Sequence, residues 1–144
     1  MTGIIQNLFL KPKHGQPVSA VSQVEAESGL GLVGDVSFGR SKRQVLFLEK
    51  ETLDEFGLIP GQIRENITIT GIPLAGLPPG TQLQAGEALF EVTGDCAPCQ
   101  FIEDIRPGLE AAMTGRRGTL CRVLIGGHLR VADPVQIVVV ENVF

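Results

Sequence analysis

Glycine and proline are the feature that most constrains the fold of this chain. They make up about a fifth of its 144 residues, with 18 glycines and 9 prolines. This density of turn-forming residues interrupts long helices and is typical of many short strands joined by turns. Closing the sheet removes the exposed edges that such strands would otherwise present. We therefore predict a mainly β protein, a closed or nearly closed β-barrel of about eight short strands with one or two short helices.

The length and the balance of apolar and charged residues predict one domain over residues 1–144. Hydrophobic residues make up 43% of the chain and charged residues 19%. A chain of this size and composition can bury a core without disulfides. We find no linker, internal repeat or low-complexity segment.

The charge and aromatic content exclude some classes of partner. The net charge is −4, and the chain has neither tryptophan nor tyrosine. Nucleic-acid binding needs a basic field and often aromatic platforms, so no nucleic-acid partner is expected. No apolar run is long enough for a membrane span and no signal peptide is recognisable, so we expect a cytoplasmic protein without a membrane partner. The three cysteines are then expected to be thiols.

Eight strands are expected from β-branched and apolar runs bounded by turn residues. They cover residues 3–10, 18–26, 44–48, 66–71, 81–84, 88–93, 119–125 and 134–140.

Some of these segments predict more than a strand. The first two are predicted to form a hairpin, and the polar–apolar alternation of 66–71 predicts a half-buried strand. Residues 29–43 show no clear period and are interpreted as a long functional loop. The Gly126-Gly127-His128 region is interpreted as a turn.

Two helices are expected. Residues 49–56 predict a short helix that ends at Gly57, and residues 101–113 carry an apolar stripe at helical spacing. Pro107 lies inside the second window. That helix therefore either breaks there or restarts with Pro107 in its first turn.

The Cys96-Ala97-Pro98-Cys99 motif is the sharpest local feature and falls between a strand and the second helix. A helix N-terminus favours the thiolate, which acts as nucleophile and as ligand for soft metals. Three functions fit: a redox dithiol, half of a zinc site, or a thiolate site for a soft metal or sulfur. A thioredoxin-like fold is disfavoured because residues 1–95 offer hardly a helix for a parallel crossover.

Zinc would need two more ligands. The remaining choices, Cys121, His128 and His14, match no familiar spacing. Cys121 lies in an apolar strand and is expected in the core. Asp35 follows a glycine and is at least as well explained by a side-chain turn as by catalysis.

Arginines mark two further polar clusters. In Gly115-Arg116-Arg117-Gly118, paired guanidinium groups between glycines could hold a phosphate, although a charged, solvated turn explains the motif at least as well. Arg64 and Asn66 precede the strand at 66–71. Asn66 fits a turn residue, a strand-start cap or a ligand contact, and its residue type does not decide among them.

Several short motifs in order resemble the MOSC domain, a family named from the C-terminal domain of molybdenum cofactor sulfurases, with small stand-alone bacterial members. The motifs are Gly34-Asp35, Arg43-Gln44-Val45, Pro60-Gly61, Arg64-Glu65-Asn66-Ile67, Cys96-x-x-Cys99 and Gly115-Arg116-Arg117-Gly118. The resemblance covers nearly the whole chain and implies a barrel-like β fold. One departure is Ala132-Asp133-Pro134-Val135, where relatives usually have Gly-Asp-x-Val.

The resemblance also implies a role for each site residue. Cys99 matches the cysteine that ligates the metal of the molybdenum cofactor or carries a sulfane sulfur, with Cys96 as second catalytic candidate. The cofactor's pterin carries a phosphate. The candidate residues for binding that cofactor are Arg43, Arg64, Asn66, Arg116 and Arg117.

We accordingly expect a protein that binds the molybdenum cofactor (molybdopterin) or carries sulfur, with a cysteine desulfurase or a molybdoenzyme as partner. Thiol–disulfide exchange through the Cys96–Cys99 motif and a non-catalytic binding barrel remain alternatives, and enzymatic activity stays open. Pyridoxal phosphate is not supported, because no lysine has a recognisable Schiff-base setting. The lysines are Lys11, Lys13, Lys42 and Lys50.

Overall fold

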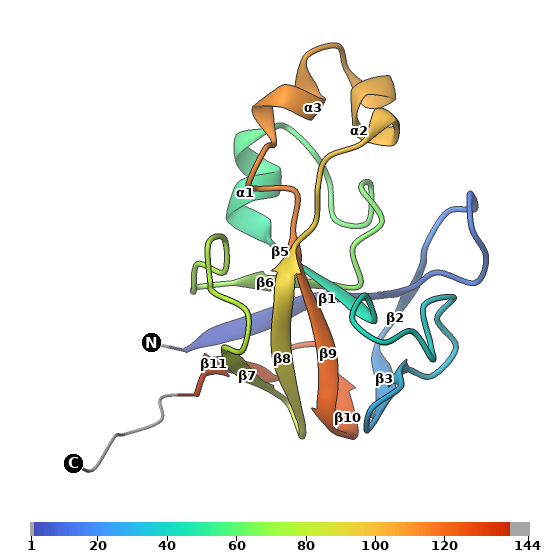
Figure 1. Cartoon of the computed structure of the whole chain (residues 1–144), viewed down its shortest axis with the longest axis vertical. Coiled ribbons are helices and arrows are strands. Elements are labelled where there is room, and N and C mark those ends of the chain that lie inside the picture. Colours follow the sequence, from blue (N-terminus) through green and yellow to red (C-terminus); the bar gives the residue numbers. More distant parts are fainter. Residues whose placement is uncertain (1, 139–144) are drawn as a thin grey trace.

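Seven strands close into a barrel in the computed structural model, which describes residues 2–138. The strands are β1 (Gly3–Leu10), β5 (Val45–Glu49), β6 (Ile67–Thr70), β7 (Gln82–Ala85), β8 (Ala88–Asp95), β9 (Thr119–Ile125) and β11 (Pro134–Ile137). Their order is β11-β7-β8-β9-β5-β6-β1, and antiparallel pairing of Gly3 with Val135 closes the circle. An extra strand, β2 (Ser19–Val21), pairs with β1. The predicted mainly β barrel is confirmed (Figure 1).

Apolar side chains from alternate strand positions fill the barrel. Phe47 on β5 and Phe90 on β8 are fully buried and pack edge to face, with ring centroids 5.1 Å apart. Cys121 on β9 is also fully buried, as expected for a core residue. Burial raises the pKa of its thiol, so Cys121 does not supply a thiolate at neutral pH.

The prediction of a half-buried strand at 66–71 is wrong. Both faces of β6 are covered, because Thr68 is as fully buried as Ile67 and Ile69. The Thr68 hydroxyl donates to Oε2 of Glu65 over 3.0 Å, which satisfies its buried polar atom. A threonine with an internal partner therefore mimics the polar alternation of a strand with one wet face.

A second, three-stranded sheet lies beside the barrel and corrects two expectations. It contains β10 (Gly127–Arg130), β3 (Gln23–Glu27) and the two-residue β4 (Gly31–Leu32). The expected strand 18–26 is therefore divided at Ser22, and only β2 forms the predicted hairpin with β1. The Gly126–His128 region is not simply a turn, because Gly127 and His128 belong to β10.

Three short helices gather at one end of the barrel (Figure 1). They are α1 (Lys50–Glu55), α2 (Gln100–Ile105) and α3 (Leu109–Ala112). The expected helix at 101–113 is thus broken around Pro107, the first of the two outcomes that the sequence allowed. Gly57, with φ +69°, follows Phe56, the C-cap residue of the first helix, so that helix ends just before Gly57 as predicted. A second apolar cluster, which includes Leu53, Ile102 and Met113, packs under these helices.

Two of the helices are the next elements in the chain after strands β5 and β8. Helix α1 connects β5 to β6, and these two strands pair in parallel, whereas β8 and β9 pair antiparallel. The Cys96–Cys99 segment follows β8 and leads into α2, so it belongs to no parallel crossover.

The expected strand 134–140 is observed to Ile137, and Val139 and Val140 lie outside the described residues. No helix in residues 2–138 has the length and apolar character needed to cross a membrane.

Candidate functional site

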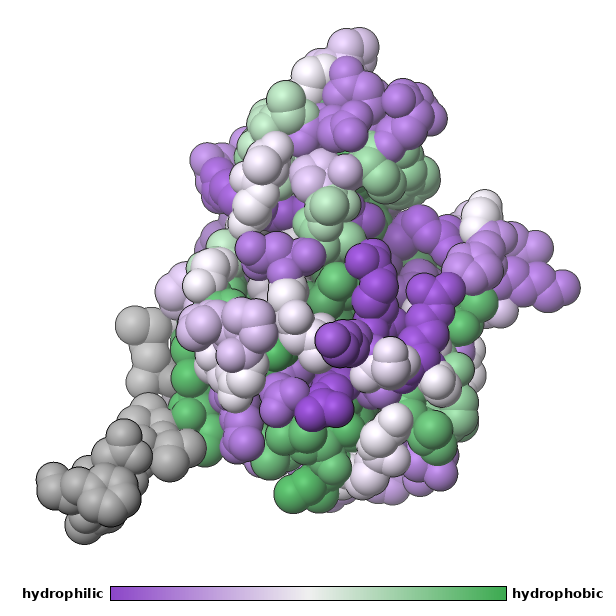
Figure 2. Space-filling model, viewed as in Figure 1, coloured by the Kyte–Doolittle hydropathy of each residue, from purple (hydrophilic) through white to green (hydrophobic). Residues whose placement is uncertain are grey.

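A cavity of about 490 Å³ lies against the barrel, next to its helical end. Four arginines and a lysine contribute to its wall, and no carboxylate of the described chain does. The cationic lining residues are Lys11, Arg40, Arg43, Arg64 and Arg117. Strongly hydrophilic residues gather below the helical end on the face shown in Figure 2. A protein with a net charge of −4 therefore concentrates positive charge at one hollow, which favours an anionic ligand.

Both cysteines of the Cys96–Cys99 motif line this cavity. The backbone N–H of Cys96 donates to the carbonyl of Gly118 over 2.9 Å, which ties the end of β8 to the start of β9. Cys99 is the N-cap residue of α2, and its carbonyl accepts from Ile102 over 2.9 Å. The two thiols differ in access, since Cys96 is 7% exposed and Cys99 is exposed. Cys99 is thus the thiol that a solute reaches directly.

Cys96 has its own cationic neighbour. Nη2 of Arg43 lies 4.0 Å from Sγ of Cys96. This contact joins Arg43 and Cys96 in one wall of the cavity. The Cys96 Sγ also lies 3.8 Å from the carbonyl oxygen of Ala97, which can accept from the thiol.

Arg117 is buried at the cavity wall and has unused donors. Its residue is 6% exposed, and its Nε and Nη1 atoms are buried without a hydrogen-bond partner. A buried guanidinium without partners is costly, because it has lost water and gained nothing in return. Guanidinium N–H groups form strong, charge-assisted hydrogen bonds to the oxygens of an oxyanion. Arg117 therefore offers the clearest anion-binding group in the described chain.

The neighbouring Arg116 points elsewhere and does not line the cavity. Its Nη1 donates to Oε1 of Glu55 over 3.0 Å, its Nη2 contacts Oε2 of the same carboxylate, and its guanidinium lies over the Phe56 ring. The hydrogen bonds to Arg116 lower the pKa of Glu55. The double-arginine motif thus supplies one inward and one outward side chain.

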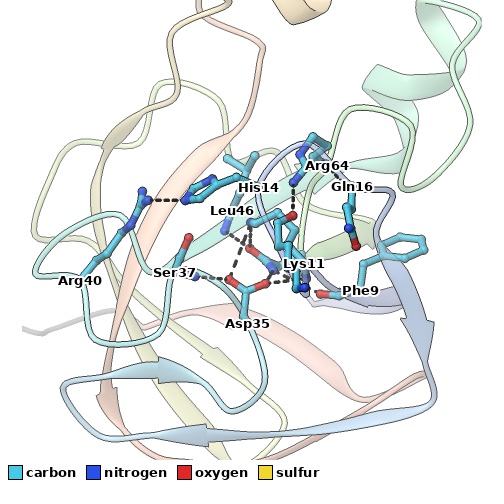
Figure 3. A network of polar contacts seen from close by, with 11 residues as sticks. Phe9, Lys11, His14, Gln16, Asp35, Ser37, Arg40, Leu46 and Arg64 are labelled. Atoms are coloured by element: carbon cyan, nitrogen blue, oxygen red, sulfur yellow. Dashed lines mark hydrogen bonds and ion pairs between the residues drawn. The ribbon is translucent and has the colours of Figure 1, made fainter.

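A polar network around Lys11 and Asp35 lies at the cavity wall (Figure 3). Nζ of Lys11 donates to Oδ1 of Asn66 over 3.0 Å and lies 3.9 Å from Oδ2 of Asp35. Asp35 accepts from the Lys11 backbone N–H over 2.8 Å and from the Ser37 backbone N–H over 3.0 Å. The second contact is the side-chain turn expected for Asp35.

Asn66 is the centre of that network. Its Nδ2 donates to the Phe9 carbonyl and to Oδ1 of Asp35, over 3.2 and 3.0 Å. Its Oδ1 accepts from the Leu46 backbone N–H as well as from Lys11, each over 3.0 Å. Both donors and both acceptor positions of the amide are therefore used. Asn66 positions the residues around the cavity, and its amide has no hydrogen bond left for a ligand.

The surroundings of Lys11 disfavour the protonated, positively charged form of its side chain. Burial is the main cause that lowers the pKa of its ammonium, and the Asp35 carboxylate opposes this shift. The positive charges of Arg64, Arg117 and Arg40 lower the same pKa further. An anion bound among these cations would relieve their mutual repulsion.

Arg64 connects the cavity to the loop that follows β1. Its backbone has φ +66°, an uncommon conformation for a residue with a side chain. Its guanidinium donates to the carbonyls of Gln16 and Lys13, the latter over 3.3 Å. In the same loop, His14 lies 3.2 Å from Nη2 of Arg40. Arg64 therefore holds one wall of the cavity in place.

The sequence-predicted residues can now be placed. Six of the seven candidates line one cavity, and Arg116 lies outside it. The six are Arg43, Arg64, Asn66, Cys96, Cys99 and Arg117. Sequence reasoning missed Lys11 and Arg40, because a lysine before a proline and an arginine in a loop carry no motif. Within residues 2–138, no three side chains of His, Cys, Asp or Glu lie close enough together to hold a metal ion.

A closed β-barrel with two thiols and a buried arginine at one cavity defines the class: a small barrel protein with a combined thiol and anion site. The family model of the MOSC domain matches residues 11–136. The chain therefore belongs to the MOSC domain family, a family linked to the molybdenum cofactor and to sulfur chemistry.

Solved structures share this fold. The YuaD protein of Bacillus subtilis superposes with a TM-score of 0.82 at 20% identity, over 95% of this chain and 96% of that chain. YiiM of Escherichia coli gives a TM-score of 0.71 at 21% identity, over 96% and 71% of the two chains. YiiM of Geobacillus stearothermophilus gives 0.73 at 21% identity, over 94% and 75%. A comparison with curated protein sequences gives no match.

Proposed function

We propose that this protein carries a sulfane sulfur on Cys99, as a persulfide held beside an anion-binding cavity. The single observation that supports it most is that exposed Cys99 and buried, unpartnered Arg117 line the same cavity. A persulfide is anionic at neutral pH and needs a thiolate to form. Cys96, in the same wall, supplies a second thiol that can take part in release of the sulfur.

A second candidate function is binding of the molybdenum cofactor, and the buried donors of Arg117 favour it. The donor set fits the cofactor: a soft thiolate suits molybdenum, and a guanidinium suits the pterin phosphate. Cys99 would hold the metal, and Arg117 with Arg64 would hold the phosphate. When bound, the cofactor would supply redox chemistry at the metal, while this chain's residues bind it and limit its contact with water.

One experiment on the purified full chain separates these candidates. Protein from a molybdenum-replete host is analysed for metal and pterin, and a second sample is incubated with a cysteine desulfurase and cysteine. The carrier function predicts a mass gain of one sulfur atom that maps to Cys99, is retained in Cys96→Ser and is lost in Cys99→Ser. Cofactor binding instead predicts co-purified molybdenum that Cys99→Ser releases.

Two results would contradict the proposal. An unreactive Cys99 without cofactor would favour a non-catalytic barrel. Reversible formation of a Cys96–Cys99 disulfide at the potential of cellular dithiols, without sulfur loading, would favour a thiol–disulfide oxidoreductase.

A further inference from the structure

We propose that the cavity accepts a dianionic sulfur donor of the thiosulfate class, a terminal sulfane sulfur bonded to a sulfonate group, and that Cys99 loads itself directly from it. This inference rests on the proposed carrier function and names the chemistry of its small-molecule donor. It adds an activity, sulfur transfer from an oxyanion, to the binding role argued above.

The wall of the cavity selects for a compact anion of high charge. Its cationic side chains face no carboxylate in the lining of the described chain. Asp35 contacts Lys11 but is itself engaged by backbone N–H groups of Lys11 and Ser37. Positive charge therefore remains in excess at the cavity, and a dianion offsets more of it than a neutral donor can.

Arg117 supplies a guanidinium for the sulfonate. Its side chain lines the cavity, and its Nε and Nη1 atoms have no hydrogen-bond partner. A sulfonate oxygen can accept a charge-assisted hydrogen bond from this guanidinium, and the charges of the two groups attract each other. Leu46 and Leu120 line the same cavity and are nearly buried. Apolar neighbours exclude water and so strengthen these charge-assisted hydrogen bonds.

The transfer needs no external oxidant or reductant. The Cys99 thiol first loses its proton to solvent, which reaches it because the residue is exposed. The thiolate then attacks the sulfane sulfur, a new sulfur–sulfur bond forms, and the bond to the sulfonate breaks with its electron pair leaving on sulfite. Cys99 becomes a persulfide anion, so atoms and charge balance. Arg117 and Lys11 stabilise the charge that develops on the departing sulfite.

Cys96 can release the sulfur from Cys99, in competition with transfer of that sulfur to an acceptor molecule. Its thiolate can attack the persulfide on Cys99, which forms a Cys96–Cys99 disulfide and releases hydrosulfide. Cyanide added as acceptor instead removes the outer sulfur as thiocyanate and regenerates the Cys99 thiolate. Thiocyanate formation therefore measures repeated loading of Cys99.

The test is a steady-state assay of the full chain with thiosulfate as donor and cyanide as acceptor. The wild type is expected to form thiocyanate and Cys99→Ser to form none. Arg117→Gln is expected to raise KM for thiosulfate about tenfold or more, since it removes charge-assisted hydrogen bonds. Arg116→Gln is the matched control, because Arg116 lies outside the cavity, and it is expected to leave KM unchanged.

Disodium tetrasulfide, a donor without a sulfonate, separates this inference from the proposed function. At a saturating concentration, where a weaker affinity no longer limits the reaction, we expect it to load Cys99 to the same final extent in wild type and Arg117→Gln, as read by intact mass. Loading by tetrasulfide without turnover of thiosulfate, or an equal KM in the two arginine variants, overturns the donor class and leaves the carrier function standing. Loading by neither donor overturns the carrier function itself. Arg64→Gln serves as a second cavity variant if Arg117→Gln does not fold.

Discussion

Asn66 shows how one buried amide can order a whole site. Its four hydrogen bonds join the ends of β1 and β5 to Asp35 and Lys11. Removing it would leave several buried groups without partners, each of which costs about 1–3 kcal/mol. This residue therefore controls the cavity without needing to touch a ligand.

We predict that Asn66→Ala lowers the free energy of unfolding by about 3 kcal/mol or more, measured by urea denaturation. Asn66→Asp is also expected to destabilise, because it replaces the donor to Asp35 with a second carboxylate. Gln62→Ala is a suitable control, since Gln62 is exposed and its Oε1 accepts only the Ile59 backbone N–H. A change below about 1 kcal/mol in both Asn66 variants would show that the network is not a structural hub.

At the scale of elements, the glycine pair at 126–127 explains why one expectation failed. Glycine pairs usually mark turns, which is the reason for the interpretation of Gly126–His128 as one. Here a Cβ on Gly127 would lie 2.7 Å from both the Cβ and the carbonyl oxygen of Glu87. The glycine is required because β10 passes close to the turn between β7 and β8, a tertiary contact that the local sequence does not encode.

We therefore predict that Gly127→Ala destabilises the protein by about 2 kcal/mol or more, because the carbonyl group of Glu87 is backbone that cannot move aside. Gly76→Ala is the matched control: its φ is +83° but its surroundings are open, so it should cost only about 1 kcal/mol of backbone strain. Chemical denaturation of both variants measures the difference. Equal losses would show that β10 adapts and that the close approach is not restrictive.

Other elements were predictable because their signals are local. Pro107 lacks the N–H of a helix interior residue, and the helix does break around it. The division of residues 18–26 at Ser22 had no such signal, since β2 and β3 are both extended and differ only in their distant partners. Strand existence is thus encoded locally, whereas pairing is decided by the rest of the chain.

At the scale of the whole molecule, closure of the barrel brings together groups that are far apart in the sequence. Lys11, Arg64 and Arg117 come from three separate segments and line one cavity. Motif order could suggest Arg64 and Arg117 but not that Arg116, one residue away, would pair with Glu55 instead. The direction of a side chain in a loop depends on its tertiary neighbours, so a motif identifies the loop and not the residue that faces the ligand.

The closed barrel leaves one cavity arginine exposed and another buried, so added salt should weaken their effects on anion binding to different extents. Arg40 is exposed at the cavity, whereas Arg117 is 6% exposed. Salt at about 0.15 M screens exposed charges beyond about 8 Å but acts much less on buried ones. We predict that Arg40→Gln weakens sulfate binding at low ionic strength and has little effect in 0.3 M sodium chloride, where the Debye length is about 6 Å. Arg117→Gln should weaken it about tenfold or more at both. Isothermal titration calorimetry on each variant measures both affinities, and parallel salt dependence of the two variants would show that depth in the barrel does not separate their roles.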